Sequence, residues 1–149
     1  MAEIMDLLRS AVGSPYPAAA AKILSFGSLD RGWNGHKAAR IPTTVQTQAL
    51  EFLISIWNKF GTSVAEPTEV APTSDGGVAL EWIVKEGVRD KGIEIIVFDR
   101  HSEFTVRDRA DGTIEQDAES VDFDFLLRNV IDRYVSGHFI LAKQSPQQK

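Results

Sequence analysis

The side chains best suited to chemistry are scattered along the chain. The three histidines, His36, His101 and His138, lie in separate segments without the spacing of a metal-binding motif. The acidic stretch 107–118 does not fit a calcium loop, because arginines occupy two of the ligand positions. The chain has no cysteine, which excludes thiolate catalysis, and no G-x-S-x-G or G-x-G-x-x-G motif. We therefore predict no catalytic residue, no metal site and no cofactor.

A group of arginines suggests a different chemistry. Arg100, Arg107 and Arg109 lie close in sequence to Phe98, and aromatic rings interleaved with cations are typical of surfaces that bind single-stranded nucleic acid. Acidic neighbours neutralise the same region, and the net charge of −5 disfavours binding to phosphates. We expect a mixed-charge strand edge there, with nucleic-acid binding through these arginines as the alternative.

The composition is that of one globular domain. A chain of 149 residues with 43% hydrophobic and 25% charged residues can bury a core without disulfides. No stretch approaches the roughly 18 apolar residues of a membrane helix. Glu3 and Asp6 replace the positive charges of an export signal, so a cytoplasmic location without membrane contact is expected.

The order of hydrophobic periods predicts the fold class. Helical patterns before residue 42 are followed by a long helix with a 3.6-residue period and by segments of period two. Thr43 and Gln46 have the spacing of a capping box at the start of the long helix. Because no helix separates the strands, the sheet must be an antiparallel meander of four to five strands in an α+β domain. The predicted parts are helices and a loop over 1–42, a helix over 43–61, the sheet over 67–118, a helix over 121–137 and a tail over 142–149.

Both faces of the predicted sheet carry large apolar side chains. Ile83, Ile96 and Phe98 alternate with the residues that would face the core, and they share their face with Glu81 and Glu94. Burying each of them is worth roughly 1.5–3 kcal/mol, so we expect a cover over this second face. The preferred candidate is the N-terminal helical segment. The alternative is another chain, through self-association or partner binding.

The segment "LDRGWNGHKAARIPTT" places Trp33 between two glycines in a polar loop. We expect the indole to anchor this loop on the core, with Trp57 and Trp82 as packing companions. The alternative is a binding knob formed by Trp33, Asn34 and His36.

The same loop takes part in a wider pattern. "GWNG" (32–35), followed by "PTEVAPTSDGGVALEW" (67–82), resembles a widespread family of small bacterial proteins of unknown function. That family shows a G-W-D/N-G turn and then P-x-V-x-P-T-x-D-G-G-x-x-L-E-W before an antiparallel sheet. The resemblance covers about the middle third of the chain. It implies the fold and a bacterial, cytoplasmic origin, assigns no catalytic residue, and suggests an accessory protein of defence or toxin–antitoxin loci.

Three functional classes follow from these observations. The first is a non-enzymatic protein-interaction module of bacterial or phage origin, such as an antitoxin, an immunity protein or an inhibitor of a defence complex. It would bind a protein partner or a second copy through Ile83, Ile96 and Phe98 or through the Trp33 loop. The second is a small hydrolase whose Asp, Glu and His side chains assemble in space. The third is a nucleic-acid-binding accessory protein that uses the arginines.

Overall fold

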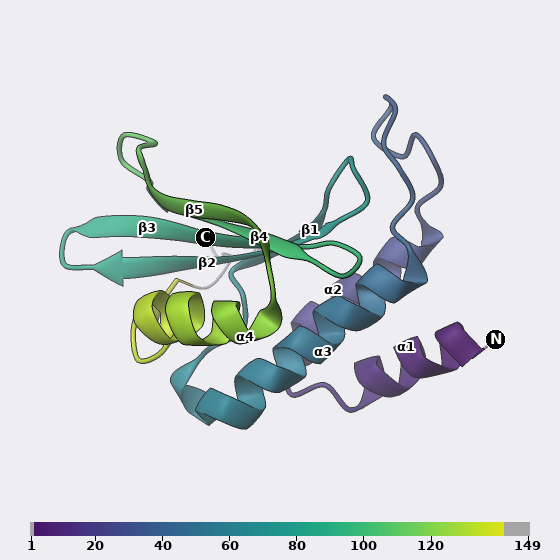
Figure 1. The fold of residues 1–149 in the computed structure, drawn as a ribbon, viewed down its shortest axis with the longest axis horizontal. Helices are drawn as coiled ribbons and strands as arrows, with labels where there is room; N and C mark the ends of the chain where they lie inside the picture. The colour runs from purple at the N-terminus through teal and green to yellow at the C-terminus, as the bar shows by residue number, and fades with distance from the viewer. Residues whose placement is uncertain (1, 142–149) are drawn as a thin grey trace, which may run out of the picture.

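The helices lie on one side of a single antiparallel sheet (Figure 1). The computed structural model describes residues 2–141, and side chains from residue 4 onward. Within that range, no helix is long and apolar enough to cross a membrane. The helical elements are α1 (Ala2–Val12), α2 (Pro17–Ser25), η1 (Phe26–Ser28), α3 (Thr43–Phe60), η2 (Gly61–Ser63), α4 (Phe123–Leu126) and η3 (Leu127–Val135).

The sheet is a meander in the order β1-β2-β3-β4-β5, which confirms the predicted α+β class. Each strand pairs antiparallel with the next one along the chain. A short strand after the last helix also pairs with β2, and the sequence pattern gave no indication of it. The strands are β1 (Glu69–Pro72), β2 (Val78–Glu86), β3 (Arg89–Val97), β4 (Ser102–Asp108), β5 (Ile114–Val121) and β6 (Phe139–Ile140).

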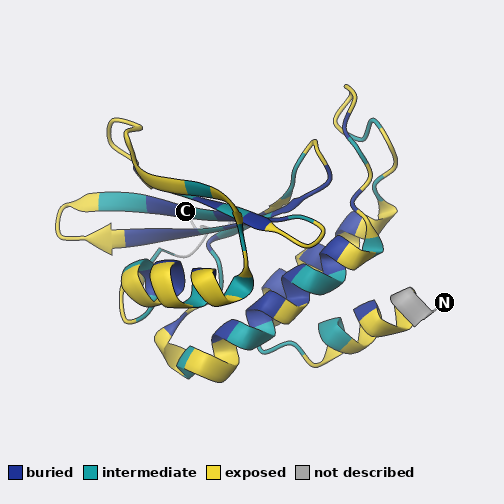
Figure 2. Ribbon diagram, viewed as in Figure 1, coloured by how far each residue is buried: buried dark blue, intermediate teal, exposed yellow. Residues whose placement is uncertain are grey.

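The period-two alternation defines two faces, which we call inner and outer. The inner face meets the helices and forms one core with them (Figure 2). Trp82 is fully buried at its centre, and its indole N–H donates to the Ala65 carbonyl over 3.0 Å. The other buried inner-face residues include Val78, Leu80, Val84, Ile93, Ile95, Val97, Phe104 and Val106.

A threonine joins two short strands at one edge of the sheet. The Thr68 hydroxyl accepts from the Ile83 N–H over 3.1 Å and donates to the Leu141 carbonyl over 2.6 Å. The Leu141 N–H in turn donates to the Ile83 carbonyl over 2.8 Å. β1 pairs with the first half of β2 and β6 with its second half, and the Thr68 hydroxyl bridges the gap between the two.

The predicted capping box at the start of α3 is wrong. Pro42 is the N-cap residue and no side chain caps the helix. Gln46 is buried instead, and its amide donates to the Ile23 carbonyl over 2.9 Å. The amide thereby joins α3 to the last turn of α2, where the Ile23 carbonyl also accepts the Phe26 N–H.

The C-terminal helix occupies the predicted place but has an unexpected backbone. Asp122 caps it by accepting the Phe125 N–H over 2.8 Å. The nine residues of η3 then adopt π-helical hydrogen bonding, and Gly137 follows with a φ of 76°. The predicted tail over 142–149 lies outside the described residues.

Candidate binding surface

The outer face of the sheet is the surface without a helical cover in the described part of the chain (Figure 1). α1, α2 and α3 all contribute side chains to the inner-face core. The expectation that the N-terminal helices shelter the outer face is therefore wrong. Each helix buries its apolar stripe against one surface, and here that surface is the inner face of the sheet for all of them.

Three glutamates form a row across the outer face. In the strand register Glu69 lies opposite Glu81, and Glu81 lies opposite Glu94. Like charges directly opposite one another destabilise a sheet. Burial raises the pKa of the Glu81 carboxyl, and Glu94 and Glu69 raise it further, whereas Arg109 and Arg107 act in the opposite direction. The row thus imposes an electrostatic cost that the fold does not require.

A glycine makes room for this charged cluster. A Cβ atom on Gly92 would lie 3.2 Å from Glu81 Oε2 and 3.8 Å from Arg109 Cγ. Because glycine has no side chain, both groups can lie close to the backbone of β3. The result is a hollow of about 200 Å³. Its lining residues are Glu81, Gly92, Glu94, Thr105, Arg107, Arg109 and Gly112.

An apolar corner lies beside the glutamate row. Ile96 and Phe98 are half-buried and pack over Gly77, where an added Cβ would come within 2.8 Å of both side chains. The Phe98 ring also stacks on His101, with 5.0 Å between centroids and 14° between planes. Ile96 and Phe98 therefore share one part of the outer face, and both are neither fully buried nor fully exposed.

Ile83 has a different environment from the other two outer-face residues. It is 9% exposed, and its peptide group is bonded to Thr68 and Leu141 at the β1–β6 junction. Of the three predicted apolar binding residues, only Ile96 and Phe98 offer accessible apolar surface.

The loop that contains Trp33 is closed by its own hydrogen bonds. The Trp33 indole N–H donates to the Ala39 carbonyl over 3.0 Å, and the Gly32 N–H donates to the Ala38 carbonyl over 2.7 Å. Trp33 is only half-buried, and among the described residues no ring contact joins it to another aromatic side chain. The predicted packing of Trp33 on Trp57 and Trp82 is wrong, because the indole satisfies its N–H within the loop.

The two halves of the sequence pattern meet in space. The Ala39 N–H of the Trp33 loop donates to the Ser74 carbonyl over 2.8 Å, which ties the loop to the "PTSDGG" turn. Thr73 holds this turn, since its Oγ1 accepts the Gly77 N–H over 2.8 Å. Asn34 and His36 stay exposed at the tip of the loop, joined by a 2.9 Å hydrogen bond from the His36 N–H to Asn34 Oδ1. The pattern therefore describes one structural unit of loop, turn and outer-face strand.

The three arginines do not form one cluster. Arg107 and Arg109 line the hollow over Gly92. Arg100 lies in the turn between β3 and β4, where its N–H donates to Gln48 Oε1 of α3 over 3.1 Å. The β3–β4 hairpin places Arg100 at one end and Arg107 at the other, so the three arginines do not gather at one edge, and nucleic-acid binding through them stays a prediction.

The glutamate row and Gly92 were not identified as a candidate site from the sequence. The alternation of apolar and polar residues placed Glu81 and Glu94 on one face, which was the sequence signal for the row. Only the strand register shows that the two residues lie opposite each other. Gly92 gave no signal of its own, since a glycine inside a strand also marks bulges and bends.

A second acidic cluster lies at the far end of the hairpins and is largely paired. Lys91 contacts Glu86 over 3.1 Å and Glu115 over 3.2 Å, and Arg89 contacts Asp108 over 2.9 Å. Within the described residues, no group of three or more His, Asp and Glu side chains has the geometry to hold a metal ion.

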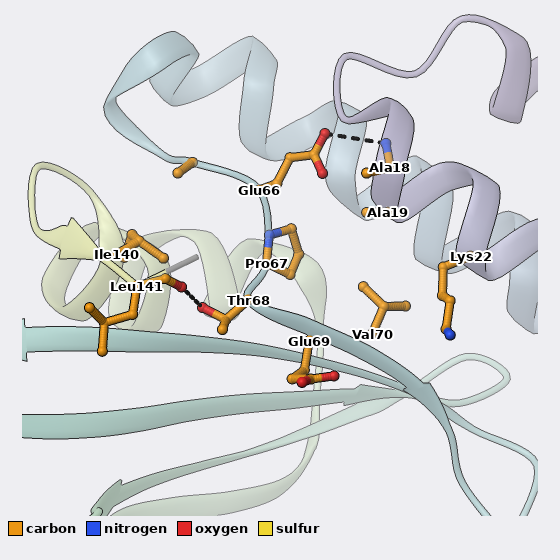
Figure 3. A pocket seen from close by; sticks show the side chains of 11 residues that line it. Ala18, Ala19, Lys22, Glu66, Pro67, Thr68, Glu69, Val70, Ile140 and Leu141 are labelled. Carbon is orange, nitrogen blue, oxygen red and sulfur yellow. Dashed lines mark hydrogen bonds between the residues drawn. The ribbon is translucent and has the colours of Figure 1, made fainter. Parts of the chain in front are cut away.

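A groove lies on the opposite side of the glutamate row from the arginines. It is a hollow of about 420 Å³ between α2, β1 and β6 (Figure 3). Small residues line it on the helix side, and Lys22 stands at one end with its ammonium group toward β1 (Figure 3). None of the residues in this groove was a sequence-based candidate.

Comparison of the chain with known protein families, with curated proteins and with solved structures finds no match.

Proposed function

We propose that this chain is a protein-binding module and that a partner protein binds the outer face of its sheet. One observation carries the proposal: no described helix covers this face, although it holds accessible Ile96 and Phe98 beside the glutamate row. An uncovered surface that combines apolar side chains with an electrostatic cost is a typical binding surface. The Trp33 loop lies next to it and extends the surface.

The charges of the outer face favour a basic partner. Acidic side chains outnumber basic ones there, so a partner with Lys or Arg side chains would relieve the repulsion within the glutamate row. Near the "PTSDGG" turn, an apolar side chain of the partner would pack on Phe98 and Ile96. The acidic residues on this face include Glu69, Glu81, Asp90, Glu94, Glu103 and Asp117, and the basic ones include Lys85, Arg107 and Arg109.

The biological class follows from the sequence resemblance. An antitoxin, an immunity protein or an inhibitor of a defence complex acts by covering another protein, which requires a surface and no catalytic group. The resemblance also supports a bacterial or phage origin and a cytoplasmic location. Fractionation of native cells tests the location, and recovery of the chain from the soluble cytoplasmic fraction is the expected result.

Charge reversal tests the proposed surface. The tagged chain is used to capture proteins from the native host, and each captured protein is then titrated with purified variants. Glu81→Lys combined with Glu94→Lys should weaken binding by at least tenfold, because two favourable charge pairs become repulsive. Glu51→Lys, at an exposed position on α3, is the matched control and should leave the affinity unchanged. Equal effects of the two reversals would refute the outer face as the surface.

Self-association is the competing use of the same face. Two copies placed face to face would bring their acidic surfaces together, which favours a different protein as partner. Sedimentation velocity at micromolar concentration should show a monomer. A dimer that Glu81→Lys strengthens would identify a second copy as the occupant instead.

A small hydrolase is the second candidate, and the carboxyl pair in the hollow favours it. Glu81, whose pKa is raised by burial and by Glu94, lies opposite Glu94 in the same hollow, and two neighbouring carboxyl groups resemble the acid and base of some hydrolases. If this pair is catalytic, Glu81→Gln abolishes turnover of a substrate while leaving its binding intact. If the outer face is a protein-binding surface, the same substitution changes partner affinity only slightly and no turnover is seen.

A further inference from the structure

The groove beside β1 runs along an edge of the sheet that pairs with no further strand in the described part of the chain. β1 is the terminal strand of the meander, and the groove follows its outer edge (Figure 3). Edge strands carry backbone groups that can pair with another chain. Natural proteins commonly shield such edges with prolines, and Pro67 and Pro72 flank the exposed part of this one. The unshielded part is therefore short.

The hydrogen bonds at the β1–β6 junction show which peptide groups face the groove. The N–H and carbonyl of Ile83 both point toward β1 and β6, since they bond to Thr68 Oγ1 and the Leu141 N–H. In an antiparallel ladder, the peptide N–H and carbonyl groups of every second residue point the same way. The N–H and carbonyl of Glu81 therefore also point toward β1. The N–H and carbonyl of Glu69, the residue opposite Glu81, point toward β2. The peptide groups of Thr68 and Val70 must then point away from β2, toward the groove.

These two peptide groups have no other partner among the residues that the structure describes. Across residues 2–141, neither forms a backbone hydrogen bond with a turn, loop or helix cap, and no side chain bonds to them. Val70 is only 8% exposed, so its N–H and carbonyl lie where an unpaired polar group is costly. An extended segment that supplies the missing bonds would remove this cost.

The side chains of the groove favour a segment with a carboxylate. Ala18, Ala19 and Ala65 leave room for a second backbone. Glu66 is already engaged, because its Oε1 accepts the Ala18 N–H over 3.3 Å. Lys22 forms no ion pair within the described residues. Although Glu66 and Glu69 also line the groove, Lys22 is its cation without an ion-pair partner among the described residues, so a carboxylate of a bound segment would pair with it.

We propose that an extended peptide segment of a partner protein adds to β1 as a further strand, pairs with the peptide groups of Thr68 and Val70, and places an Asp or Glu side chain against Lys22. This edge is separate from the apolar corner and from the hollow over Gly92, although Glu69 both lines the groove and begins the glutamate row. Recognition by strand addition combines main-chain hydrogen bonds, which give affinity, with side-chain contacts, which give specificity.

The test uses the isotope-labelled full chain and the hexapeptide acetyl-Thr-Val-Thr-Asp-Val-Thr-amide as the probe. The peptide should shift the amide resonances of Thr68 and Val70 and slow their hydrogen exchange by about tenfold or more, because both N–H groups become hydrogen-bonded. A peptide with N-methyl groups at alternate residues lacks the pairing donors and should cause neither effect. A Val70 amide that is already protected in the free chain would overturn the proposal, as would an absence of shifts in the groove.

Charge variants test the contact with Lys22. Lys22→Glu should weaken binding of the hexapeptide about two- to fivefold, the range for an exposed ion pair, and a peptide with Lys in place of Asp should recover it. Lys59→Glu on α3 is the control and should have no effect. Glu81→Lys with Glu94→Lys should leave peptide binding unchanged. If the hexapeptide does not bind, the proposal for the outer face is unaffected. If the charge reversal does not weaken partner binding, the proposal for the groove is unaffected.

Discussion

The two faces of the sheet are built from the same strands but differ in burial and in charge. On the inner face Leu80, Trp82 and Ile95 are fully buried in one apolar core. On the outer face, the intervening residues Glu81 and Glu94 repel each other, and apolar side chains are only half-buried. The inner face is explained by stability. The outer face includes a charge row that stability alone would not select, which indicates that another requirement shaped it.

The largest predicted difference between the faces is the cost of removing an aromatic ring. Trp82→Ala should lower the free energy of unfolding by about 3–5 kcal/mol, because it leaves a cavity in the core and an unpaired Ala65 carbonyl. Phe98→Ala on the outer face should cost about 1 kcal/mol, since that ring is already half in water. Urea denaturation measures both. Equal losses would contradict the distinction between a core face and a surface face.

The apolar corner on Gly77 gives the next largest effect. Gly77→Ala should destabilise the chain by about 1–3 kcal/mol, because its methyl group would lie 2.8 Å from both Ile96 and Phe98. Gly13→Ala is the control, since its Cβ would meet only the Arg9 carbonyl at 3.6 Å. Thermal unfolding of the two variants checks the prediction. If Gly77→Ala is as mild as the control, Ile96 and Phe98 are mobile on the surface.

Ser102 is an unsatisfied polar group among the buried residues at the start of β4. It is 1% exposed, and its hydroxyl has no hydrogen-bond partner within the described part of the chain. Ser102→Ala should therefore raise the free energy of unfolding by about 1 kcal/mol, as it removes an unsatisfied buried hydroxyl. A measured loss of stability in urea would show that the hydroxyl has a partner in solution.

The smallest predicted effect concerns the pH dependence of the glutamate row. A carboxyl whose pKa is higher in the folded state stabilises the fold at low pH, and this contribution is lost as the pH rises through the folded pKa. For Glu81 the loss begins above the ordinary value of 4.5. Glu81→Gln should thus raise stability at pH 7 by about 0.2–1 kcal/mol and have little effect below pH 4. Unfolding of both proteins across this pH range is the measurement, with Glu51→Gln as a control that should leave the profile unchanged.

The parts of the fold that were predicted correctly depend on local periodicity. The long stripe of α3 and the alternation of β2, β3 and β4 are repeated over enough residues to identify the elements and their faces. The Asp111-Gly112 pair between β4 and β5 is a local turn signal of the same kind, since Gly112 has a φ of 75° and the Asp111 side chain accepts the Thr113 N–H. Each of these signals lies within a few neighbouring residues.

The errors all concern contacts between distant segments. Gln46 had a local capping partner in Thr43 and instead bonds to α2, which lies 23 residues away in sequence. Trp33 had apolar partners on other elements and instead bonds within its own loop. The side of the sheet that α1 and α2 occupy depends on chain geometry that no periodicity encodes. For the same reason the glutamate row emerged only with the strand register.

Site-specific photo-crosslinking in native cells tests the central claim most directly. A photoreactive residue placed at Thr105, on the outer face, is compared with one placed at Glu51, on the exposed side of α3. If the outer face binds the partner, Thr105 forms a single strong adduct with another protein, and Glu81→Lys with Glu94→Lys removes it, while Glu51 gives none. An adduct at Glu51 alone, or a Thr105 adduct that survives the charge reversal, would contradict the claim that partners bind the uncovered face of the sheet.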